Sequence, residues 1–64
     1  MNSALTERDK RLNRIVSSME LVHSYSITAA QFAWRGDEDG LKKELAALRL
    51  CVLEAFKTFK ELDK

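Results

Sequence analysis

Residues 36–40 read Gly36-Asp37-Glu38-Asp39-Gly40, and this stretch decides the fold. It holds both glycines of a 64-residue chain that has no proline. Glycine and proline are the residues that most often interrupt a helix, so the sequence on each side can run as one uninterrupted helix. We therefore predict a helix at about residues 4–35, a loop at 36–40 and a second helix at about residues 39–63.

The ends of these segments carry capping signals. Thr6 with Asp9 three residues later, or alternatively Ser3, can cap the start of the first helix. Arg35 followed by Gly36 suits a helix C-terminus, where a cation meets the helix dipole and glycine adopts the left-handed conformation. The acidic run after Gly36 suits the start of the next helix. The longer first helix is expected to extend past the second, leaving residues 1–11 with little to pack against.

Apolar side chains recur in both segments at spacings of three and four residues, and neither segment alternates at period two. This pattern predicts helices with one apolar seam each, and excludes strands. A short loop makes the helices antiparallel neighbours. The expected fold is all-α: an antiparallel two-helix hairpin, one domain over residues 1–64, that dimerises into a four-helix bundle. The residues assigned to the core and dimer seam are Leu12, Ile15, Met19, Val22, Leu41, Leu45, Leu48, Val52, Phe59 and Leu62.

Both helices carry more apolar surface than one seam needs. A separate stripe in the first helix runs through Leu21, Tyr25, Thr28 and Phe32, almost opposite the seam. Two helices cannot bury this surplus alone, so it meets a second copy or a different protein. Symmetric dimers are the commonest oligomers, so we expect a homodimer whose remaining apolar surface binds a larger protein. The candidate partner-binding residues are Leu21, Tyr25, Phe32, Trp34, Leu50, Leu53 and Phe56.

Catalytic and cofactor chemistry has little to build on. One Cys and one His cannot make a structural zinc site, and 64 residues leave no room for a cofactor domain. Cys51 is expected to be a small buried hydrophobe and His23 to be structural. No acid–base pair or activated nucleophile can be assembled, so the chain is expected not to be an enzyme, and to bind no cofactor or metal.

The charge balance constrains the partners. Eleven basic and ten acidic residues give a net charge of +1, which disfavours a dedicated nucleic-acid binder. The one basic cluster, diluted by neighbouring acids, comprises Arg8, Lys10, Arg11 and Arg14. No apolar run is longer than Leu50–Leu53, which is far too short to cross a membrane. The start at Met1 lacks an apolar signal segment and the thiol is free, so we expect a cytoplasmic protein.

A long helix, the Gly36-Asp37-Glu38-Asp39-Gly40 break and an unbroken seam from Leu41 to Leu62 resemble several small helical-hairpin families. These are a plasmid copy-number RNA-binding dimer, small type III secretion co-chaperones, and phage-encoded inhibitors of host regulators, including quorum-sensing anti-activators. The resemblance to the last group implies a module that binds and inhibits or escorts a larger protein, such as a transcriptional regulator. The alternatives are a small nucleic-acid-binding regulator and a secretion co-chaperone.

Overall fold

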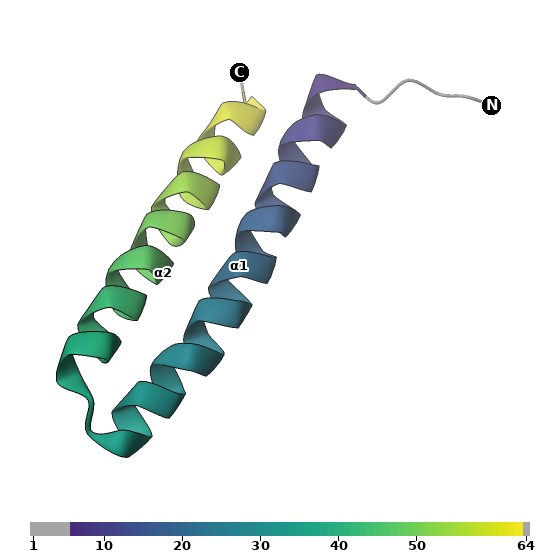
Figure 1. Ribbon diagram of the computed structural model, residues 1–64. Coiled ribbons are helices and arrows are strands. Elements are labelled where there is room, and N and C mark those ends of the chain that lie inside the picture. Colours follow the sequence, from purple (N-terminus) through teal and green to yellow (C-terminus); the bar gives the residue numbers. More distant parts are fainter. Residues whose placement is uncertain (1–5, 64) are drawn as a thin grey trace.

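The computed structural model describes residues 6–63, which form an antiparallel helical hairpin (Figure 1). Helix α1 spans Glu7–Arg35, helix α2 spans Glu38–Lys60, and a short 3-10 turn, η1, spans Glu61–Asp63. The described start of α1 and the end of α2 lie at one end of the hairpin, and the connection lies at the other. The predicted all-α hairpin is confirmed.

The start of α1 follows the predicted capping box. The Thr6 hydroxyl accepts a hydrogen bond from the Asp9 backbone N–H at 3.0 Å, and Asp9 Oδ2 accepts one from the Thr6 N–H at 3.3 Å. The helix therefore begins at Glu7 rather than near residue 4, because Thr6 is the extended N-cap. Ser3, the alternative cap, lies outside the described residues.

The connection between the helices is shorter than predicted. Gly36 takes the left-handed conformation (φ 73°, ψ 21°) and ends α1, while Asp37 caps α2 by accepting the Gly40 N–H at 3.0 Å. Only Gly36 and Asp37 thus lie between the helices, and the predicted loop at 36–40 is wrong over 38–40. Gly40 is inside α2, where its missing side chain has a packing purpose. A Cβ on Gly40 would lie within 2.5–2.9 Å of three atoms of the Phe32 ring.

The overhang of the first helix is shorter than expected within the described residues, and residues 1–5 of the expected overhang lie outside them. Helix α1 has 29 residues, while α2 with η1 has 23 and then 3, so the two arms end at nearly the same level. Arg11 lies within the contact: its Nη1 donates to the Glu61 carbonyl oxygen at 3.4 Å. The α2 helix itself ends at Lys60 rather than at about 63, because its last residues tighten into η1.

The surface shared by the two helices, here called the hairpin contact, buries only small side chains completely. Its three buried residues among those described are Ala29, Ala55 and Thr58, and no large side chain there is fully buried. Most of the less exposed positions form one series with a four-three spacing along each arm of the hairpin. The series comprises Arg11, Ile15, Ser18, Val22, Tyr25, Ala29 and Phe32 on α1, then Leu41, Glu44, Leu48, Cys51, Ala55 and Thr58 on α2, and Leu62 in η1.

The hairpin contact is rotated from the seam that the sequence predicts. The two patterns share Ile15 and Val22 on α1, while Leu12 and Met19 of the seam are each replaced in the contact by the preceding residue. In the second arm they share Leu41, Leu48 and Leu62, and the preceding residue again replaces Leu45, Val52 and Phe59. One residue turns a helix by about 100°, so exchanging half the members rotates the mean direction by roughly 50°.

Candidate protein interface

The rotation leaves large apolar side chains exposed on one side of the hairpin. The predicted seam is rotated in the same sense about each helix axis, toward the next residue in the sequence. Because the two helices are antiparallel, this rotation moves both seams toward the same side of the hairpin. We call this surface the apolar face. Its members have between 38% and 55% of their surface exposed and are Leu12, Val16 and Met19 of α1 with Leu45, Val52, Phe56 and Phe59 of α2.

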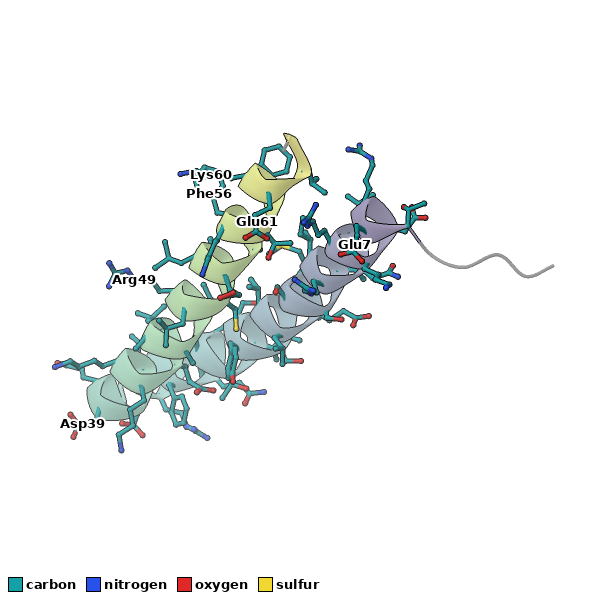
Figure 2. The ribbon with its side chains drawn as sticks, turned by 90° about the horizontal axis from the view of Figure 1, so that it is seen from above. Glu7, Asp39, Arg49, Phe56, Lys60 and Glu61 are labelled. Carbon is teal, nitrogen blue, oxygen red and sulfur yellow. The ribbon has the colours of Figure 1, made fainter. Side chains whose placement is uncertain are left out.

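A shallow hollow crosses the apolar face and joins the two helices. Ile15 and Met19 line it from α1, and Val52, Ala55, Phe56 and Phe59 line it from α2. The rings of Phe56 and Phe59 are stacked, with centroids 6.5 Å apart. The Lys60 ammonium lies 5.0 Å from the Phe56 centroid at the edge of this surface. Figure 2 shows Arg49, Phe56 and Lys60 on the side of α2 that is turned away from α1.

The opposite side of the hairpin holds a polar hollow. It is lined mainly by charged, hydroxyl and amide side chains: Lys10, Asn13, Arg14, Ser17, Ser18, Glu54 and Thr58. The hairpin therefore has an apolar hollow on one side and a polar hollow on the other. An amphipathic element buries its apolar side against something else.

Trp34 forms a second exposed apolar site near the connection. It is 91% exposed, and Ile27, seven residues earlier, is 49% exposed. Each lies five residues after a member of the hairpin contact, which places both roughly opposite α2. Trp34 shares a small hollow with Ala30, Gln31 and Arg35. We call this surface the tryptophan site.

The predicted seam residues divide into two groups. Ile15, Val22, Leu41, Leu48 and Leu62 lie half-buried on the hairpin contact. The others lie on the apolar face and are exposed: Leu12, Met19, Leu45, Val52 and Phe59. The predicted seam therefore contains residues of two different surfaces, the hairpin contact and the apolar face.

The candidate partner-binding residues do not form one surface. Tyr25 and Phe32 are half-buried on the hairpin contact instead of on an outward stripe, because that contact is rotated toward them. Phe32 packs against Gly40 on one ring face and lies 5.1 Å from the Arg35 guanidinium.

The remaining five candidates point in several directions. Phe56 belongs to the apolar face and Trp34 to the tryptophan site, while exposed positions elsewhere hold Leu21, Leu50 and Leu53. Val16 and Ile27 were missing from the candidate set. Val16 lies four residues after Leu12, and Ile27 lies seven residues before Trp34. Helical spacing therefore places each on the same helix face as its neighbour.

The basic cluster is partly engaged with neighbouring groups. Lys10 pairs with Glu7 at 3.4 Å, and Arg11 donates to the Glu61 carbonyl. Lys10 and Arg14 both line the polar hollow, where Glu54 also lies. Two of the four basic side chains, Lys10 and Arg11, are therefore paired with an acid or a carbonyl of this chain.

Cys51 and His23 occupy unremarkable positions. Cys51 is half-buried on the hairpin contact, and His23 is exposed beside Met19 and Glu20. Within residues 6–63, no three His, Cys, Asp or Glu side chains are grouped as metal ligands. In the same part of the chain, neither helix is long and apolar enough to cross a membrane.

Comparison with known proteins adds no relative. No protein-family model matches the chain, and neither a curated protein nor a solved structure matches it. Functional conclusions therefore rest on the chain's own surfaces.

Proposed function

We propose that this chain is a non-enzymatic interaction module that binds a larger protein and inhibits or escorts it. The observation that carries the proposal is Trp34, 91% exposed on α1 with Ile27 two turns away. An indole with about nine-tenths of its surface exposed loses contact with water only when a partner covers it. Trp and Arg are the residues most enriched among those that dominate binding energy, and Arg35 adjoins Trp34.

The partner class follows from the chemistry of this site. An aromatic side chain, an aliphatic side chain and a guanidinium on one rigid helix fit an apolar pocket rimmed by acceptors on another protein. Because the chain resembles inhibitors of host regulators, we propose a transcriptional regulator as the partner. The engaged basic side chains and the net charge of +1 favour this protein partner over a nucleic acid.

The experiment starts from immobilised chain and a cell lysate. A captured protein is identified by mass spectrometry, purified and titrated by calorimetry against Trp34→Ala and against Leu50→Ala. Leu50 is a suitable control because it is 68% exposed on α2, away from the tryptophan site. Trp34→Ala is expected to weaken binding by about 30-fold or more, while Leu50→Ala leaves it nearly unchanged.

Two outcomes contradict this function. Equal affinities for the wild type and Trp34→Ala would show that the indole is no anchor. A mobility shift with RNA or duplex DNA at low salt, falling steeply as salt rises, would instead support the nucleic-acid-binding alternative.

A further inference from the structure

We propose that the apolar face is covered by a second copy of this chain, packed face to face with the two connections at opposite ends. The product is an antiparallel four-helix bundle. This proposal uses the apolar face and not the tryptophan site, so it stands or falls separately from the proposed function.

The first argument is the direction of the apolar side chains. In a bundle with four helices at the corners of a square, each helix turns its apolar stripe toward the centre. That direction lies about 45° from the neighbouring helix of its own hairpin. The predicted seam lies roughly 50° from the hairpin contact, on the same side for both helices. A two-layer bundle therefore accounts for the whole pattern, whereas a solitary hairpin accounts for half of it.

The second argument is the amount of apolar surface that the hairpin leaves uncovered. Its contact buries Ala29, Ala55 and Thr58 but fully buries no large side chain of the described residues. A domain of this size needs a disulfide, a metal or a partner chain to build a sufficient core. The sequence has a single cysteine, which cannot close an internal disulfide, and a second copy supplies the missing layer.

The third argument is the size of the face. From Leu12 to Ala33, helix α1 is about 30 Å long, and two helices side by side are about 20 Å wide. The projected area of roughly 600 Å² approaches the ~800 Å² of accessible surface that each partner buries in a standard interface. A second copy fits this requirement without any further element.

The orientation of the second copy follows from the shape of the face. Its bulky side chains gather toward the open end, where Leu12, Val16 and Met19 lie opposite Val52, Phe56 and Phe59. Toward the connection, the face keeps Leu45 on α2, but the same spacing on α1 continues through the small residues Ser26, Ala30 and Ala33, all exposed. With the connections at opposite ends, each bulky half meets the partner's half that has small residues on α1. With the connections together, bulky meets bulky and small meets small, which overpacks one end and leaves voids at the other.

The association is tested by measuring mass by sedimentation equilibrium from about 5 µM to about 500 µM chain. The chain has a mass of 7.3 kDa, so the expected dimer is twice that value. Val52→Glu and Met19→Glu place a carboxylate in the face and should raise the dissociation constant at least about 100-fold. Leu50→Glu is the matched control: it changes an exposed leucine that lies off the face, and it should leave the mass at the dimer value.

Circular dichroism separates loss of association from loss of folding. If Val52→Glu or Met19→Glu unfolds, the wild type decides the question: its Tm should rise with chain concentration, as it does for any folded dimer. A wild-type chain that is monomeric and folded at the highest concentration overturns the proposal. So does a Val52→Glu variant that stays fully dimeric.

Spin labels test the orientation. In a Cys51→Ala background, a label at Asp39→Cys sits at the start of α2, beside the connection. Connections at opposite ends place the two labels about 30 Å or more apart, since α2 is about 35 Å long. A distance below about 20 Å would put both connections at one end and overturn the orientation.

Discussion

Gly40→Ala offers a test in which the usual rule for helices should reverse. Alanine in place of glycine inside a helix stabilises it by about 0.5–1 kcal/mol. Here the new Cβ would lie 2.5, 2.6 and 2.9 Å from three atoms of the Phe32 ring. Real Cβ contacts do not occur at these distances, so the ring or the helix must move. Phe32 is half-buried between the helices, and overpacking of this kind costs about 1–3 kcal/mol.

The two effects oppose each other, and the clash should win. We expect Gly40→Ala to lower the free energy of unfolding by about 1 kcal/mol, equivalent to a fall in Tm of about 4–8 °C. The assay is thermal and urea unfolding followed by circular dichroism at one fixed chain concentration, because association would otherwise shift the midpoint.

A double-mutant cycle isolates the ring as the cause. Phe32→Ala removes the atoms that the new Cβ meets, so Gly40→Ala in that background should stabilise the hairpin by about 0.5–1 kcal/mol. The coupling energy between the two sites should therefore be about 1–3 kcal/mol. If Gly40→Ala raises stability equally in both backgrounds, the close packing of Phe32 on α2 is refuted.

Three further tests probe the hairpin contact and the caps by urea unfolding. Ala29→Leu should destabilise the chain by about 1–3 kcal/mol through overpacking. Its control, Ala46→Leu on the exposed side of α2, should change stability by less than about 0.5 kcal/mol. Similar effects of the two substitutions would contradict the close approach of the helices. Thr6→Ala and Asp37→Ala should each cost about 1 kcal/mol by removing an N-cap acceptor, and unchanged midpoints would refute the caps. Leu48→Asp should abolish the cooperative transition because it puts a carboxylate on the hairpin contact, and a normal melt would show that Leu48 is misplaced.

The features that depend only on residues close together in the sequence could be predicted from it. The Gly36 break, the capping box of Thr6 and Asp9, and the acidic start of the second helix all follow from local chemistry. The predicted loop is longer than the observed connection because glycine usually interrupts a helix. Gly40 instead stays helical, since the Phe32 ring takes the place of its side chain.

The direction of the helix contact could not be predicted from spacing alone. The spacing of apolar residues gives the average direction of all side chains that favour burial, whether the same chain or another chain covers them. The hairpin contact is selected by close approach, which small residues such as Ala29, Ala55 and Thr58 allow. Tyr25 and Phe32 were therefore assigned to a separate stripe although they line that contact. This average direction does not distinguish residues of the hairpin contact from residues that another chain covers.

The two-residue connection also sets how readily the chain can exchange its helices with a neighbour. The contacts between α1 and α2 would be the same if each came from a different chain, so the closed hairpin is favoured over a swapped dimer mainly by the conformations of Gly36 and Asp37. The left-handed conformation of Gly36 (φ 73°) costs an L-residue about 1–2 kcal/mol. An alanine at this position favours a helix that continues through the turn, and the opened chain is then one rod about 85 Å long. Two such rods side by side can form the same contacts between α1 and α2 as two hairpins, so replacing Gly36 should promote domain swapping in this fold.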